Sequence, residues 1–300
     1  MTGLTLLAYL GHCEKQDSPE YGDNVLQGIK YLLELNEKLG GKMYSRKPGY
    51  ETGICTYALS EAYIITKNFR PRIPGIESAL HRSVKVIVEK QCKDGGWDYS
   101  YGDRGTGSDT SVTGWQLQAL KVAKLTGINF PGLDSAMDKA MENLMRVRGP
   151  NGGFGYRQPQ DRLSLTGVGV LGMQMWDPRK YRKEIDAGVD FIVNSYGKYE
   201  NPGEHFNKYG WYYHTQACFQ KSGSAWRDWN RFFQDAVVSK QDDAGFWIDW
   251  GHAHGPAKDS IEGKVYTTTL CILMLEIYYR YLQNTGDDKH RKGATALKNS

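Results

Sequence analysis

The feature that most constrains the fold of this chain is a doublet of a hydroxyl-bearing residue and a tiny one, which returns at the head of one apolar run after another. Thr113-Gly114 opens the run "WQLQALKVAK", although glycine inside a helix costs about 1 kcal/mol relative to alanine. The copies follow one another at intervals of about 40 to 60 residues, which is typical of stacked or circular arrays of supersecondary units. The other copies are Thr2-Gly3, Thr52-Gly53 and Thr166-Gly167, with weaker ones at Tyr209-Gly210 and Thr267-Thr268.

A second series of helices, each with one apolar face, alternates with these runs. The segments "GIESALHRSVKVIVEK" and "GLDSAMDKAMENLMRV" carry apolar residues at helical spacing, and weaker versions lie near 24–38, 180–196 and 226–240. One-faced helices lie on a surface, whereas the doublet runs are apolar or aromatic nearly all round and are expected to be buried. We therefore predict an all-α fold, an α/α toroid of about six inner and five to six outer helices.

The glycine of the doublet has a role in such a ring. Inner helices converge at one end of the barrel, and a residue without a side chain lets neighbouring backbones approach closely. The toroid is expected to span residues 1–283, followed by a polar, frayed tail at 284–300. Because six inner helices alternate with five outer ones, we expect an outer helix to precede residue 1, where further domains can also lie.

The outer helices end in a shared pattern of glycines followed by an aromatic residue. It reads "KQCKDGGWDY", "VRGPNGGFGY" and "KQDDAGFW", with a reduced copy in "LGGKMY". We expect the glycines to be helix C-caps and the aromatics Trp97, Phe154 and Trp247 to staple each turn to the next repeat.

Composition narrows the classes of partner. The chain has 38 lysines and arginines against 34 aspartates and glutamates, a net charge of +4, and these residues are scattered, which argues against nucleic-acid binding. No apolar run approaches the length needed to span a bilayer, and the start of the chain has no basic segment typical of a signal peptide. The cysteines are odd in number and form no CxxC pair, so we expect free thiols. They are Cys13, Cys55, Cys92, Cys218 and Cys271.

An outer helix that ends Gln-x-x-Asp-Gly-Gly-Trp and is followed by a buried helix resembles the repeat of squalene–hopene cyclases and protein prenyltransferase β subunits. The chain is most similar to bacterial prenyltransferase/squalene-oxidase-repeat proteins, through the runs "SDTSVTGWQ", "YGWYY" and "YTT". The resemblance covers residues 1 to about 283. It implies a toroid whose aromatic-lined lumen binds an isoprenoid or a similar hydrophobic ligand.

Asp109 is the first candidate catalytic residue that the resemblance implies. Terpene cyclases of this type protonate their substrate with an Asp-x-Asp-Asp-Thr segment, and the matching stretch here is Thr106-Gly107-Ser108-Asp109-Thr110. The companion acid that would hold the proton is absent. Asp98 and Asp103 lie in the preceding loop and could rebuild a carboxylate pair. The alternatives are a helix N-cap for Asp109 and turn formation for Asp98 and Asp103.

His214 is the second candidate, because "YYHT" resembles the segment that carries the zinc-binding histidine of protein prenyltransferases. His214 and Cys218 are an i, i+4 pair. The position two residues before Cys55 holds glycine instead of the acid of the Asp-x-Cys motif, so an ordinary buried histidine is the alternative. His252 and His254, beside Asp249, are a second weak zinc candidate, with solvated imidazoles as the alternative. We expect no cofactor.

The aromatic residues of the doublet helices are expected to line the lumen and bind the ligand. A carboxylate inside a buried helix needs a partner or must face the lumen, which adds a glutamate to the set. The predicted ligand-binding residues are Tyr57, Glu61, Trp115, Trp211, Tyr213 and Tyr266.

Three functions remain open at this stage. The first is a cyclase- or transferase-like enzyme that uses Asp109 as a degenerate acid. The second is a non-catalytic binding or scaffold module within a larger protein. The third is a carbohydrate-active toroid, which requires two inward carboxylates, such as Glu61 with Asp109 or Asp161.

Overall fold

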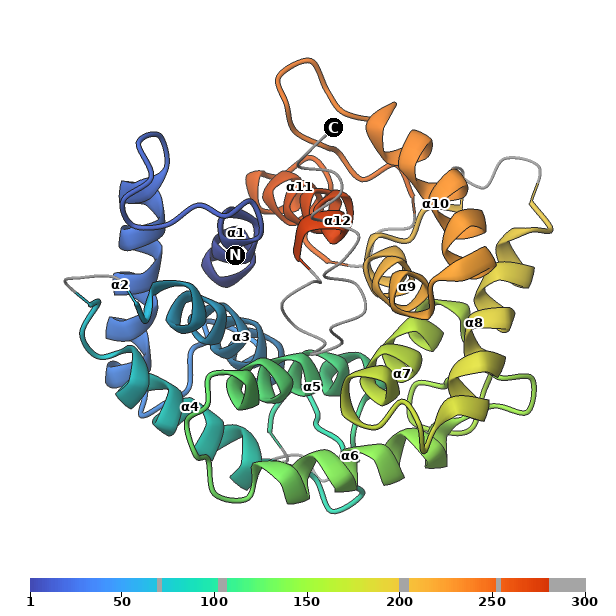
Figure 1. Ribbon diagram of the computed structural model, residues 1–300, viewed down its shortest axis with the longest axis horizontal. Helices are drawn as coiled ribbons and strands as arrows, with labels where there is room; N and C mark the ends of the chain where they lie inside the picture. Colours follow the sequence, from blue (N-terminus) through green and yellow to red (C-terminus); the bar gives the residue numbers. More distant parts are fainter. Residues whose placement is uncertain (69–71, 102–106, 200–204, 252–254, 281–300) are drawn as a thin grey trace.

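Within the part of the chain that the structure describes, six helices stand side by side around the centre of the molecule (Figure 1). The computed structural model describes residues 1–68, 72–101, 107–199, 205–251 and 255–280. Residues 279 and 280 are described by their backbone alone. The first inner helix packs against both the second and the last, so the ring is closed. The inner helices are α1 (Thr2–Gly11), α3 (Pro48–Thr66), α5 (Thr110–Leu125), α7 (Leu163–Trp176), α9 (Lys208–Lys221) and α11 (Ile261–Leu275).

The described residues form five outer helices that wrap this ring, and each carries the chain from one inner helix to the next. Between α10 and α2, where α1 meets α11, no outer helix lies among the described residues (Figure 1). The all-α toroid predicted from the repeat is therefore confirmed; the expected tail, 284–300, lies outside the described residues. The outer helices are α2 (Gly22–Lys38), α4 (Ile76–Glu89), α6 (Leu133–Val147), α8 (Arg182–Tyr196) and α10 (Gly223–Val238), and a short α12 (Ile277–Arg280) follows α11.

Burial follows the two patterns of the sequence. In α6 the buried residues form one stripe that includes Leu133, Met137 and Leu144, whereas α5 is buried almost all round. No helix in the described parts of the chain is both long and apolar enough to cross a membrane.

The doublet glycines lie where inner helices come closest. A Cβ atom on Gly114 would be 2.5 Å from Cγ1 of Val168 in α7. One on Gly167 would be 2.8 Å from the backbone nitrogen of His214 in α9. Both distances are shorter than real Cβ contacts allow, which confirms that glycine permits the close approach of inner helices.

The threonine of the doublet binds the junction that arrives from the preceding outer helix. The amide of Trp97 donates to Oγ1 of Thr113 (3.0 Å), and Phe154 donates to the threonine of the next doublet in the same way (3.2 Å). In the last repeat the amide of Trp247 donates to Thr268 (3.0 Å) and not to Thr267. The position predicted for this doublet, Thr267-Thr268, is therefore wrong by one residue. The residue that corresponds to Thr113 is Thr268, because its hydroxyl binds the junction.

Gly40 is the helix C-cap glycine predicted for its junction, because it directly follows the cap residue of α2 at φ +58° and its amide donates to the carbonyl of Glu37 (3.2 Å). The glycines of the other three junctions are not helix C-caps. Helix α4 ends with Lys90 as its cap, and Gly95, at φ +89°, lies in the turn that follows. Gly152 (φ +95°) and Gly245 (φ +86°) occupy equivalent turns. The aromatics of these turns have the structural role expected of them, because the indole of Trp97 donates to the carbonyl of Ile87 (2.7 Å) and that of Trp247 to the carbonyl of Val237 (2.8 Å).

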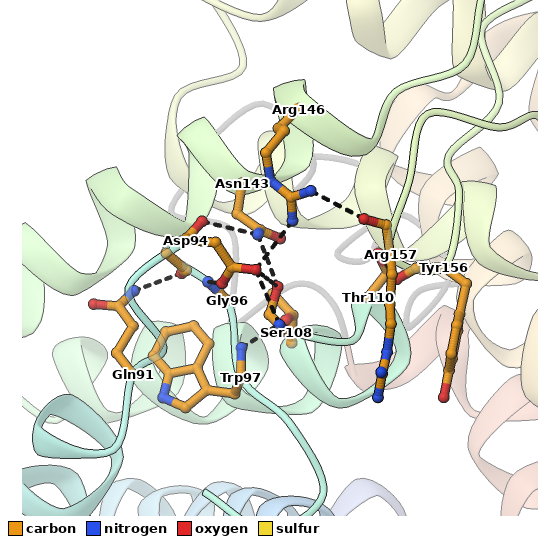
Figure 2. Close-up of polar contacts among 12 residues, drawn as sticks. Gln91, Asp94, Gly96, Trp97, Ser108, Thr110, Asn143, Arg146, Tyr156 and Arg157 are labelled. Atoms are coloured by element: carbon orange, nitrogen blue, oxygen red, sulfur yellow. Dashed lines mark hydrogen bonds and ion pairs between the residues drawn. The ribbon is translucent and has the colours of Figure 1, made fainter. Parts of the chain in front are cut away.

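Asp94 ties the α4–α5 junction to the outer helix α6 (Figure 2). Its Oδ2 accepts hydrogen bonds from the amide and hydroxyl of Ser108, both at 3.0 Å, and forms an ion pair with Arg146 (3.2 Å). Asn143 donates to the carbonyl of Asp94 (2.9 Å) and to the Ser108 hydroxyl (2.8 Å). Ser108, which replaces an aspartate of the cyclase motif, is thus part of the framework that places Asp109.

Candidate functional site

The long junctions of the fold all arrive at one face. The inner helices run in the same direction, because an outer helix returns the chain each time, so every outer-to-inner junction ends at the N-terminal face of the inner ring. Loops on a rigid scaffold are the usual place for binding residues. The long junctions at this face are 90–109, 148–162, 197–207 and 239–260, whereas those at the opposite face are 12–21, 67–75, 126–132, 177–181 and 222.

Five tyrosines gather at this N-terminal face, and we call them the tyrosine cluster. The rings of Tyr50 and Tyr99 lie 5.2 Å apart, and the hydroxyl of Tyr156 donates to that of Tyr99 (3.2 Å). Tyr50 donates to Oγ of Ser111 (2.7 Å). The cluster therefore combines residues of two junctions with residues of α3, α9 and α11, and its members are Tyr50, Tyr99, Tyr156, Tyr209 and Tyr266.

Several phenols of this cluster are held in the neutral form. Burial raises the pKa of Tyr50, Tyr209 and Tyr266, and the neighbouring phenols or carboxylates raise the pKa of each further. The Tyr209 hydroxyl donates to the carbonyl of Ser111 (2.6 Å). Apart from Tyr209, the members are half-buried, so the cluster presents ring faces and neutral hydroxyls together.

Asp109 lies beneath the cluster as the N-cap of α5. Its Oδ1 accepts from the amides of Ser111 (2.9 Å) and Val112 (3.3 Å) and, in a short contact, from the Ser111 hydroxyl. The N-cap alternative is therefore confirmed, whereas a catalytic role stays a prediction. Its Oδ2 is buried. Burial, and after it the interaction with the Asp109 carboxylate, raise the pKa of Tyr156, whose hydroxyl also donates to that of Tyr99 (3.2 Å).

A buried ion pair that the sequence analysis missed borders the cluster. Lys208, the first residue of α9, binds Oδ2 of Asp249 in a short contact, and both side chains are almost fully buried. The ammonium lies 5.7 Å from the centre of the Tyr266 ring, and Asp249 also accepts from the amide of Gly251 (3.1 Å). The sequence hinted at this ion pair only through a lysine directly before the Tyr209-Gly210 doublet. That lysine does not indicate that its partner is an aspartate 41 residues away.

Of the predicted ligand-binding residues, Tyr266 belongs to the tyrosine cluster, and the others are buried among the helices. Trp115 stacks on Tyr212 at 5.2 Å, and the Tyr213 hydroxyl accepts from Gln118 (3.0 Å). Glu61 is buried and has interaction partners within the protein. The role of these buried residues in ligand binding stays a prediction, because the contacts that the structure shows for them are with other protein residues. Tyr57 and Trp211 are fully buried as well.

His214 has the character of a neutral core histidine. Its Nε2 lies 2.8 Å from the carbonyl of Leu163, to which it donates, and burial lowers its pKa to about 4. Burial also raises the pKa of the neighbouring Cys218 thiol. In the described ranges no group of three or more His, Cys, Asp or Glu side chains could hold a metal ion. A zinc site at His214 and Cys218 stays a prediction, and Asp103, His252 and His254 lie outside the described residues.

The other candidate carboxylates hold turns. Asp161 accepts hydrogen bonds from the amides of Gly153 (2.8 Å) and Asn151 (3.1 Å). Asp98 accepts from the amide of Ser100 (3.1 Å). These contacts favour turn formation, the alternative that the sequence analysis kept open for Asp98.

Comparison with solved structures shows which known proteins share this fold. The chain is similar to the alpha-1,6-mannanase GH76A of Salegentibacter sp. HEL1_6, with a TM-score of 0.63, 12% identity, and coverage of 94% of this chain and 88% of the mannanase. It has this fold. An inactive variant of that enzyme, with two consecutive aspartates replaced by alanine and alpha-1,6-mannotetrose bound, gives a TM-score of 0.64 at the same identity and coverage. No protein-family model matches the sequence.

The comparison therefore supports the toroid that the resemblance to terpenoid cyclases and prenyltransferases implied. The solved structures that support it are glycoside hydrolases, not cyclases or prenyltransferases. A second ligand complex of the mannanase, with alpha-1,6-mannotriose and with the two aspartates replaced by asparagine, has a TM-score of 0.63. In the described part of this chain the one pair of consecutive aspartates, Asp242-Asp243, is exposed in the α10–α11 junction.

Proposed function

We propose that this protein binds a carbohydrate chain at the tyrosine cluster. The observation that carries the proposal is the meeting of half-buried ring faces and neutral hydroxyls from separate elements, Tyr50, Tyr99, Tyr156 and Tyr266, at one face of the ring. Aromatic faces pack against the C–H faces of sugars, while phenol groups exchange hydrogen bonds with sugar hydroxyls. An isoprenoid tail could pack against the rings but could not exchange hydrogen bonds with the hydroxyls.

Two further facts favour a saccharide over an isoprenoid. The solved structures that share the fold are mannanases, two of them in complex with mannooligosaccharides, although at 12% identity this likeness concerns the fold. The companion acid of the cyclase motif also has no counterpart at position 108, where Ser108 donates to Asp94 instead.

We propose binding of the carbohydrate chain, without its hydrolysis. Hydrolysis by the usual glycosidase mechanisms needs two carboxyl groups about 5–10 Å apart on either side of the scissile bond. Asp109 caps α5, and Asp249 is neutralised by Lys208. At least one of the two carboxylates would thus have to be a residue other than Asp109 and Asp249. The test therefore treats hydrolysis as an outcome separate from binding.

Titration calorimetry with a panel of neutral and acidic oligosaccharides tests the proposal, with α-1,6-mannotetraose as the first neutral probe. We expect at least one member to bind, and the affinity to fall about three- to tenfold when Tyr156→Phe or Tyr50→Phe removes a hydroxyl. Tyr31→Phe is the matched control, because Tyr31 is 52% exposed on the outer helix α2.

Two outcomes would contradict carbohydrate binding. One is the absence of any binding across the panel. The other is capture of isoprenoid diphosphates or squalene, seen by mass spectrometry, with an affinity that the tyrosine-to-phenylalanine changes leave intact. Chromatography of the incubated oligosaccharides shows in the same experiment whether any of them is cleaved.

A further inference from the structure

Three cationic side chains lie over the rings of two tyrosines in the cluster. The ammonium of Lys47 is 5.2 Å from the centre of the Tyr99 ring. The guanidinium groups of Arg157 and Arg162 are 5.4 Å and 5.7 Å from the centre of the Tyr156 ring. Because the two tyrosines are joined through their hydroxyls at 3.2 Å, the cations bracket a single surface.

The carboxylates closest to these cations in the sequence are engaged elsewhere. Glu51 accepts hydrogen bonds from the amides of Ser45, Arg46 and Lys47, and therefore binds the backbone that carries Lys47 instead of its ammonium. Asp161 binds amides of its own turn. Within the described ranges neither Lys47 nor Arg162 forms an ion pair with a carboxylate; the Nε of Arg162 donates to the neutral side chain of Gln160 (2.7 Å).

The surroundings add positive potential to this surface. Lys47 is the N-cap residue of α3, and Arg162 is the N-cap residue of α7. The N-terminal end of a helix carries a partial positive charge, which favours anions. Arg162 and Lys47 are exposed, so both can reach a bound ligand.

We propose that the ligand of this site is an acidic oligosaccharide whose sugar units carry carboxylates, as in a chain of uronic acids. This inference rests on the proposed carbohydrate binding. The hydroxyls and ring faces of Tyr99 and Tyr156 contact the sugar rings, while Lys47 and Arg162 pair with carboxylates on either side. A guanidinium binds a carboxylate through two parallel hydrogen bonds, and its contact with the tyrosine ring holds it in place beforehand.

Matched probes separate this inference from carbohydrate binding itself. Tetragalacturonate and tetramannuronate are each compared with their carboxyl-reduced forms, which keep the ring hydroxyls and carry a neutral CH2OH group in place of each carboxylate. We expect at least one acidic form to bind about tenfold more tightly than its reduced counterpart at low salt, and the difference to shrink at about 1 M sodium chloride. Binding of a reduced form or of α-1,6-mannotetraose as tight as that of every acidic form overturns the acidic preference and leaves carbohydrate binding standing. No binding of any saccharide overturns both.

Single substitutions test the residues. Arg162→Gln and Lys47→Gln are expected to weaken binding of the preferred acidic probe about three- to tenfold each and to leave the binding of its reduced form unchanged. Arg182→Gln is the control, because Arg182 is 81% exposed on the outer helix α8. Equal loss for the acidic and the reduced form would mean that these side chains only shape the site, and would contradict the assignment.

Discussion

Gly95 lies so close to the outer helix α6 that a Cβ atom built on it would be 2.1 Å from the carbonyl oxygen of Lys139. Gly41 and Gly152 make the same approach to the next outer helix, to carbonyl oxygens of Arg82 and Ala187, both at 2.6 Å. Each junction is thereby pressed onto the outer helix that follows. Gly245 has the same left-handed conformation, but a Cβ atom on it would have no atom of the described residues within 4 Å.

This difference predicts unequal costs for one and the same substitution. Gly245→Ala should lower the free energy of unfolding by about 1 kcal/mol, the cost of a left-handed residue with a Cβ. Gly95→Ala should cost at least about 2 kcal/mol more, because the new methyl group must also displace backbone. Urea denaturation of the two variants measures both values, and equal losses would contradict the packing described for Gly95.

The buried pair of Lys208 and Asp249 predicts a strong asymmetry between single and double changes. Lys208→Met leaves the carboxylate of Asp249 buried without its partner, and should cost about 3–5 kcal/mol of unfolding free energy. Adding Asp249→Asn removes the charge and should recover part of that loss. Lys85→Met is the control for an exposed pair, since Lys85 is 73% exposed beside Glu89, and should cost less than about 1 kcal/mol. A double variant less stable than Lys208→Met would argue against this explanation.

Local patterns in the sequence were enough for the architecture. The doublet at Thr113-Gly114 and the one-faced helix from Leu133 predicted an inner and an outer ring, because periodicity and burial are properties of a single element. The N-cap role of Asp109 was also open to prediction, since a cap binds amides two and three residues away.

Pairings between distant elements were beyond the same reasoning. The contact between Lys208 and Asp249 and the contact between Tyr99 and Tyr156 each depend on how two segments far apart in the sequence meet in space. The aromatic candidates were selected from inner helices, where Trp115 is buried between neighbours, whereas two of the clustered tyrosines come from loops. Periodicity says which face of a helix is buried, but it does not distinguish a neighbouring helix from a ligand.

Asp109 offers a test that separates capping from charge. Asparagine caps helices as well as aspartate does, so Asp109→Asn should leave the free energy of unfolding within about 0.5 kcal/mol of the wild type. Asp109→Ala removes the acceptor for the amides of Ser111 and Val112 and should cost about 1–2 kcal/mol. Urea denaturation gives both numbers. If asparagine were as destabilising as alanine, the negative charge itself would be what α5 requires.

His214 predicts how stability changes with pH. Its pKa is lowered by burial from 6.5 to about 4, so the folded protein binds fewer protons than the unfolded chain between these values. The stability that this neutral histidine contributes is fully present above about pH 6.5 and is lost as the pH falls toward 4, up to about 3 kcal/mol. Unfolding free energies of the wild type and of His214→Gln, measured from about pH 7.5 to 4, should therefore converge as the pH falls. Parallel curves would show that the imidazole is not held neutral by burial, and would reopen His214 as a functional group.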